Sequence, residues 1–109
     1  MAPRLLLVAA CLVGLAGPAA AAAPSGVTVA IANFTYDPAT LTVPTGTEVT
    51  WVNRDDIPHL IVATDGRFQS PPLDTDDSFT TRFSEPGEVD YFCSLHPHMT
   101  GRVIVTPAS

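Results

Sequence analysis

The stretch Cys93–Met99, which reads CSLHPHM, places a thiol, two imidazoles and a thioether within seven residues of one another. It follows a β-rich run, Val89–Phe92, so one loop at the end of a strand can turn these side chains toward a single point. Thiolate and thioether donors favour copper(I), and imidazole binds copper in both oxidation states, whereas calcium and magnesium prefer oxygen. We therefore expect a copper site here. A second imidazole from elsewhere would complete it, and His59 is the candidate.

The amino-terminal residues have the pattern of a secretory signal peptide. Arg4 precedes an apolar run over residues 5–16, and small Ala-rich residues follow to Ala23. The run is too short to span a membrane and ends at a Gly-Pro pair, which disfavours a retained anchor. We expect residues 1–23 to be removed and the protein to be periplasmic or secreted. Cys11 leaves a second possibility, a lipoprotein processing site, although the apolar stretch before it is very short.

Cleavage near Ala23 leaves residues 24–109, which is enough for one small domain with a single core. A domain of this size gains stability from a metal that binds the folded state. Cys93 would be its only cysteine, so no disulfide can form within it. In an oxidising compartment a lone thiol is a liability, and metal ligation would mask it.

The charge balance is acidic: eleven Asp and Glu face five basic residues, all of them arginine. Nucleic-acid binding needs a clustered basic footprint, which these scattered arginines do not supply, so we expect no nucleic-acid partner. We interpret the acidic surface as a feature that keeps the protein soluble, and the alternative is that it steers a basic partner protein toward the chain. We also expect no stable membrane insertion and a monomeric protein.

Alternation of apolar and polar residues with period two predicts six to eight short strands separated by Pro- and Gly-containing turns. Residues 64–77 are expected to be a surface connection with at most one short strand, near Phe68, and no helical pattern of useful length is present. Trp51, Phe79, Phe83 and Tyr91 are assigned to the core, without a redox role. This pattern predicts an antiparallel sandwich or barrel, with strands over residues 26–34, 40–43, 48–53, 60–63, 78–83, 89–93 and 101–106.

A blue-copper centre needs two imidazole nitrogens and a thiolate in one plane, with a weak thioether bond along the axis. His59 lies where a polar loop enters a β-rich run, and the short gap from Cys93 to His96 lets a tight turn direct both side chains to one ion. Met99 would close the loop from above. His98 competes with His96 for the second imidazole position.

These motifs resemble a known family. The pattern Cys-x2-His-x2-Met, preceded by Tyr-Phe and followed by Gly-Arg-Val-Ile-Val, is similar to the cupredoxins, most of all the amicyanin and plastocyanin type. Residues 49–59 and 34–46 resemble the segments around the first ligand His in that family, so the likeness covers nearly the whole mature chain. It implies an all-β, cupredoxin-like Greek-key sandwich of seven to eight strands.

The resemblance also implies a single copper ion that alternates between Cu(I) and Cu(II), with four ligands: His59, Cys93, His96 and Met99. The family spacing favours His96 over His98, which would then point to solvent. Two positions depart from the family pattern. Leu60 stands where an Asn usually ties the two ligand segments together, so we expect Asn53 and Ser94 to make that connection. His98 stands where an apolar residue is common.

The resulting hypothesis is a periplasmic one-electron carrier whose unidentified redox partner proteins dock where the His96 ring approaches the surface. The alternative is a copper-binding protein for storage or delivery, with His98 assisting exchange. An enzyme is disfavoured, because catalytic type 2 copper needs further imidazoles and the whole chain has three histidines. A hydrolase is no better supported once His59 and His96 are ligands.

Overall fold

Residues 26–108 are described by the computed structural model of the protein, so the predicted signal peptide, residues 1–23, lies outside the described residues. The described part folds into β1 (Val27–Ala32), β2 (Thr35–Asp37), β3 (Thr40–Pro44), β4 (Thr47–Asn53), β5 (Val62–Ala63), β6 (Ser78–Phe83), β7 (Gly87–Cys93) and β8 (His96–Thr106). No segment within residues 26–108 is a helix long and apolar enough to cross a membrane.

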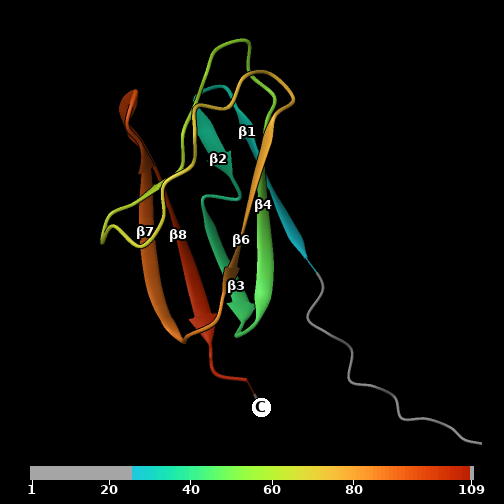
Figure 1. Ribbon diagram of the computed structural model, residues 1–109, viewed down its shortest axis with the longest axis vertical. Coiled ribbons are helices and arrows are strands. Elements are labelled where there is room, and N and C mark those ends of the chain that lie inside the picture. Colours follow the sequence, from blue (N-terminus) through green and yellow to red (C-terminus); the bar gives the residue numbers. More distant parts are fainter. Residues whose placement is uncertain (1–25, 109) are drawn as a thin grey trace, which may run out of the picture.

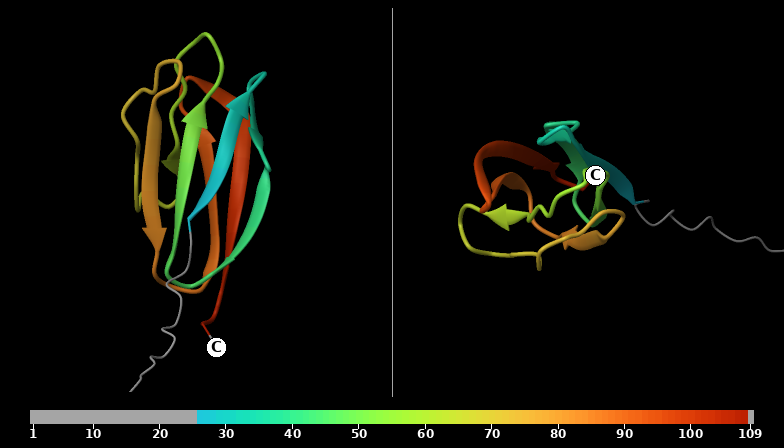
Figure 2. Two further views of the ribbon diagram at one scale, coloured as in Figure 1. Left: turned by 90° about the vertical axis from the view of Figure 1, so that its right-hand side faces the viewer. Right: turned by 90° about the horizontal axis from the view of Figure 1, so that it is seen from above.

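The eight strands form two four-stranded sheets that pack face to face, in the orders β2-β1-β4-β6 and β3-β8-β7-β5 (Figures 1 and 2). The predicted alternation is visible in β4, where Val49 and Trp51 point inward and are fully buried. The expected all-β sandwich of seven to eight strands is therefore confirmed.

Two of the strand pairings are parallel, which corrects the expectation of a purely antiparallel sandwich. β1 pairs with β4, and β3 pairs with β8, both in parallel. The reason is that the chain passes to the second sheet at β3 and returns at β4, which then lies beside β1 in the same direction. Such pairing depends on the path of the whole chain, and local alternation does not encode it.

The core is built around Trp51, which is fully buried. Four aromatic rings surround it with centroids 5.3–6.3 Å away: Phe68, Phe79, Phe83 and Tyr91. Trp51, Phe83 and Tyr91 are buried as predicted, and Phe79 packs against the same cluster while partly exposed. A Cβ at Gly101 would overlap the Tyr91 ring, so only glycine fits opposite this tyrosine on β8.

The last hairpin is tighter than the sequence predicts. β8 begins at His96 instead of residue 101, and Cys93 pairs with His96 across a turn made by Ser94 and Leu95. The register then shifts, because Phe92 pairs with Thr100 and leaves residues 97–99 as a bulge in β8. The expected ligand loop is therefore a strand hairpin. It lies at the upper end of Figure 1 with the β1–β2 turn and the loop after β4.

The strand predicted over residues 60–63 is shorter in the structure, where β5 covers only Val62–Ala63. The preceding backbone pairs with the long connection instead: His59 and Leu73 exchange two backbone hydrogen bonds, and the Ser70 amide donates to Ile61. The surface connection thus has two isolated bridges, His59 with Leu73 and Val62 with Gln69, and no strand at Phe68.

The two tyrosines predict how stability depends on alkaline pH. Burial raises the pKa of Tyr91 from 10.0 to about 12, and burial, with a smaller contribution from the neighbouring Cys93, raises that of Tyr36 further. In each case the neutral form is favoured in the folded state. Their contribution to stability is therefore complete below pH 10.0 and is lost as the pH rises toward the folded value.

We expect tyrosinate absorbance to appear only when the protein unfolds, and the unfolding free energy to fall above pH 10.0. Alkaline titration followed by absorbance and circular dichroism would measure both. Tyr91→Phe should make the fall shallower, because phenylalanine has no hydroxyl to ionise. Ionisation of both tyrosines near pH 10.0 in protein that keeps its native spectrum would contradict this assignment.

Candidate metal centre

Three predicted ligands meet at the upper end of the sandwich. One ligand atom from each of His59, Cys93 and His96 lies within 4.8 Å of the others. The Cys93 Sγ is 3.8 Å from Nδ1 of His59 and 3.6 Å from Nδ1 of His96. His59 and Cys93 are fully buried, while His96 is partly exposed.

These distances fit one metal ion between the three atoms. In zinc sites the metal lies about 2.3 Å from a sulfur ligand and about 2.0 Å from a nitrogen ligand. With an angle of about 120° at the metal, these bond lengths place the sulfur and nitrogen atoms roughly 3.7 Å apart. Both Sγ–Nδ1 distances, 3.8 Å and 3.6 Å, lie close to that value. The donor chemistry, a thiolate with two imidazoles, suits copper.

The backbone around Cys93 and His59 brings the two ligand segments together. Cys93 is the last residue of β7, and its Sγ accepts a hydrogen bond of 3.4 Å from the amide of Leu60. The connection between the segments therefore uses a backbone N–H, which any residue except proline supplies at position 60. This explains how Leu60 can stand in the place of the usual Asn.

Asn53 and Ser94 do not make the connection that the sequence predicts. The Asn53 side chain is fully buried and donates to the carbonyls of Ile57 and Leu73, both at 2.8 Å, while it accepts from the Asp55 amide at 2.8 Å. It thus supports the loop that carries His59 and does not reach the Cys93 hairpin. Ser94 is exposed, and its side chain has no hydrogen bond among the described residues.

The structure separates the two competing histidines and places the methionine in the core. His98 is exposed and lies outside the group formed by His59, Cys93 and His96. Met99 is 5% exposed and belongs to the same buried cluster as Cys93. Alternation along β8 accounts for this difference, because Met99 shares the inward parity of Val103 and Val105 while His98 lies on the outward parity.

Two further residues touch the ligands and were missed by the sequence analysis. With its proton on Nε2, His59 donates to Asp55 Oδ2 at 2.8 Å, which leaves Nδ1 free to bind a metal. Phe34 lies with its ring edge-to-face against His59 and His96, at centroid distances of 5.5 and 5.0 Å. Sequence alternation extends the first strand through Phe34, so the turn that redirects this ring was not visible.

The Asp55 carboxylate is stabilised in its ionised form. Burial alone would raise its pKa, but hydrogen bonds from the amides of Phe34 and Asn33 and from the His59 ring outweigh burial and lower the pKa below its ordinary value. The negative charge therefore persists beside His59 at neutral pH.

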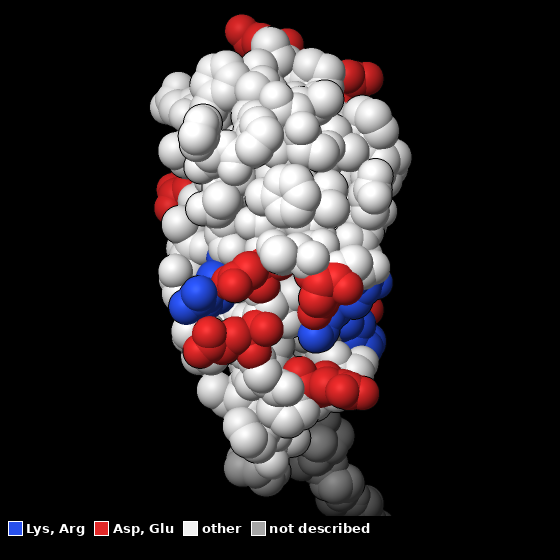
Figure 3. Space-filling model, turned by 90° about the vertical axis from the view of Figure 1, so that its left-hand side faces the viewer, with Lys and Arg blue, Asp and Glu red and all other residues white. Residues whose placement is uncertain are grey.

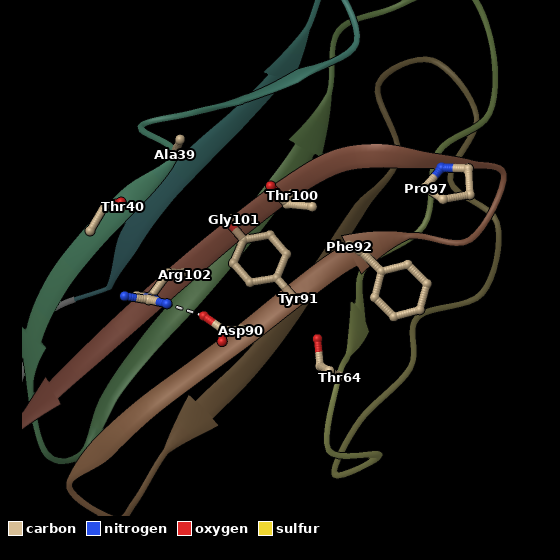
Figure 4. Close-up of a pocket in the computed structure, with 10 residues that line it drawn as sticks. All are labelled: Ala39, Thr40, Thr64, Asp90, Tyr91, Phe92, Pro97, Thr100, Gly101 and Arg102. Carbon is tan, nitrogen blue, oxygen red and sulfur yellow. Dashed lines mark hydrogen bonds and ion pairs between the residues drawn. The ribbon is translucent and has the colours of Figure 1, made fainter.

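A separate pocket of about 550 Å³ lies on the outer face of the sheet formed by β3, β8 and β7 (Figure 4). Its lining includes Thr40, Phe92, Pro97 and the ion pair between Asp90 and Arg102. None of His59, Cys93 or His96 lines it, so it is distinct from the candidate metal centre.

Comparisons with known proteins agree with this geometry. A model of the cupredoxin-like domain matches residues 4–105. Amicyanin from Paracoccus denitrificans is 34% identical over 92 residues, which are 80% of this chain and 70% of that protein. Plastocyanin from Tetradesmus obliquus is 37% identical over 83 residues, 64% of this chain and 57% of that protein. The solved purple cupredoxin from Nitrosopumilus maritimus superposes with a TM-score of 0.68 at 38% identity, over 73% of this chain and 99% of that one. The resemblance drawn from the sequence is therefore confirmed.

The buried Asn53 predicts a measurable effect on the ligand loop. Asn53→Ala would remove three hydrogen bonds and leave the Ile57 carbonyl and the Asp55 amide without partners, and we expect it to lower the unfolding free energy of the metal-free protein by about 3 kcal/mol. Denaturant unfolding measures this. Thr50→Ala on the same strand, whose hydroxyl bonds Thr80 at the surface, should cost less than about 1 kcal/mol. Equal losses in the two variants would contradict the role of Asn53.

Proposed function

We propose that this chain, which belongs to the cupredoxin-like family, is a type 1 (blue) copper protein that carries single electrons between redox proteins in the periplasm. Its cofactor is one copper ion. The observation that carries the proposal is the convergence of the Cys93 sulfur with two imidazole nitrogens at 3.6 and 3.8 Å.

In this proposal His59 and His96 would hold the copper ion through Nδ1, Cys93 through Sγ and Met99 through its thioether sulfur. Met99 is supported by its burial in the same cluster as Cys93 and by its inward position on β8. His98 is not a ligand, because its side chain is exposed and separate from the group.

Bound copper supplies a centre that gains or loses one electron as it alternates between Cu(II) and Cu(I). The chain contributes fixed donor positions. His59 is held by Asp55 through its ring and by Leu73 through its backbone, and Cys93 accepts a hydrogen bond from Leu60. If the donor atoms move little when copper changes its oxidation state, the reorganisation energy is small, and electron transfer is fast.

The surface around His96 is suited to docking a redox partner. His96 is partly exposed. The exposed large apolar side chains within residues 26–108 are Phe34, whose ring contacts the His96 ring, and Leu95, which precedes His96 in the chain. Figure 3 shows no Lys or Arg on the upper part of the face it presents, where Asp and Glu lie only at the edges, while most charged side chains gather in a belt lower down. An apolar patch over the one accessible ligand favours brief docking with electron transfer through His96.

The burial of the ligands favours a carrier over the alternative of copper storage or delivery. His59 and Cys93 are both fully buried and only His96 is partly exposed, so two of the three converging ligands are shielded from a competing chelator. Catalysis is not proposed either, because His98, the remaining histidine, is exposed and outside the ligand group. The periplasmic location rests on the signal-peptide pattern of residues 1–23 and is compatible with Cys93, the one cysteine of residues 24–109, which the metal would mask.

Copper loading tests the proposal. We expect the protein with copper(II) to show an intense thiolate-to-copper charge-transfer band that disappears reversibly on one-electron reduction. Cys93→Ser should abolish the band, since the oxygen that replaces Sγ cannot produce it. Absorption and electron paramagnetic resonance spectra measure both variants.

His98→Ala is the matched control, because it removes an imidazole from the same hairpin but from outside the ligand group. It should leave the band nearly unchanged, whereas His96→Ala should remove it. A colourless copper(II) form of the wild type would reject the carrier proposal. Rapid loss of copper to a chelator, without reversible reduction, would favour delivery.

The proposed role of the Met99 thioether predicts the direction of a change in reduction potential. Met99→Leu conserves size and burial but removes the thioether, a donor that helps stabilise copper(II). We expect copper to be retained and its reduction potential to rise, as measured by redox titration. If the potential stayed at the wild-type value, Met99 would not be a ligand.

A further inference from the structure

A single carboxylate, that of Asp55, contacts both the ligand loop and the β1–β2 turn. Its Oδ2 accepts a hydrogen bond from the His59 ring at 2.8 Å and another from the Phe34 amide at 3.0 Å. Its Oδ1 accepts from the Asn33 amide at 2.7 Å. Three donors from two separate segments thus converge on one side chain that is 15% exposed.

The turn that meets Asp55 has an uncommon backbone conformation. Asn33 and Phe34 both have positive φ, 53° and 59°, which is costly for a residue as large as Phe. In this conformation their successive amides point to the same side and form an anion-binding nest. The Asp55 carboxylate occupies that nest, which explains why the conformation is stable without glycine.

The same conformation determines where the Phe34 ring lies. The ring is 51% exposed on one side, and on the other it packs edge-to-face against both imidazoles, at 5.5 Å from His59 and 5.0 Å from His96. Asp55 therefore contacts His59 directly and reaches His96 through the turn that carries Phe34.

The Asp55 carboxylate has little freedom to move, because its own backbone is bound on both sides. Its amide donates to Asn53 Oδ1 at 2.8 Å, and its carbonyl accepts from the Thr75 hydroxyl at 2.6 Å. These contacts connect it to the end of β4 and to the long surface connection. The carboxylate is consequently a fixed point to which the His59 ring and the β1–β2 turn are attached.

We propose that Asp55 is the positioning residue of the metal centre: it fixes the His59 ring and, through the β1–β2 turn, holds Phe34 across both imidazoles. This inference rests on the proposed copper function. It adds that the site is arranged before metal binds and that the arrangement depends on one hydrogen-bonded carboxylate. Outer partners of ligand histidines commonly change metal affinity by about 10- to 100-fold.

The test compares Asp55→Asn with Asp56→Asn. Both remove one negative charge from adjacent positions, but Asp56 is exposed and makes no hydrogen bond within residues 26–108. We expect Asp55→Asn to bind copper about tenfold more weakly than the wild type, so that a chelator takes copper from it more readily. Its reduction potential should rise, because copper(II) loses the anionic partner of His59. Asp56→Asn should show near wild-type release and a much smaller shift in potential.

Hydrogen exchange on the metal-free protein gives an independent measurement. The amides of Asn33 and Phe34 should exchange faster in Asp55→Asn and at the wild-type rate in Asp56→Asn. Phe34→Ala tests whether Asp55 acts on the site through Phe34. The double variant, Phe34→Ala with Asp55→Asn, should increase copper release by less than the product of the increases in the two single variants.

Release, potential and amide exchange that are the same in Asp55→Asn and Asp56→Asn would overturn the proposal. Fully multiplicative effects in the double variant would overturn the role of Phe34. A wild-type protein that never forms the blue copper(II) site would instead reject the proposed function, and in that case the exchange of the Asn33 and Phe34 amides would still decide whether Asp55 holds the turn.

Discussion

The contact between the Cys93 sulfur and the two imidazole nitrogens is the constraint on which the rest of the structure depends. Cys93 and His96 face each other across one hairpin, but His59 is 34 residues away from Cys93 in the sequence. Both sheets must therefore bring their loops to the same end and hold them in register. Trp51 and the aromatic rings around it provide the packed core beneath that end.

Once the ligands have met, polar contacts determine how precisely they are placed. Asn53 supports the loop from within, and Asp55 orients the His59 ring while it accepts both amides of the β1–β2 turn. Buried hydrogen bonds of this kind are costly to leave unmade, so they specify one arrangement. An electron carrier benefits from such rigidity, because it must change oxidation state without rearranging its ligands.

Much of the fold and of the site could be predicted from the sequence, because period-two alternation and ligand chemistry are local signals. Strand β4 with Trp51 inward, and the candidates His59, Cys93 and His96, follow from such signals. The parallel pairing of β1 with β4 could not be predicted, since it depends on the path of the chain. The roles of Phe34 and Asp55 were also hidden: each arises from a turn with positive φ that a Phe would ordinarily avoid.

The central claim is that the chain arranges its ligands before the metal binds. Crystal structures of the metal-free and copper-loaded protein, compared under the same conditions, test it most directly. We predict that the Cys93 Sγ remains close to 3.8 Å from His59 Nδ1 and 3.6 Å from His96 Nδ1 in both, with Phe34 across the two rings. A metal-free structure in which His59 or Phe34 has moved away, and returns only with copper, would contradict the account.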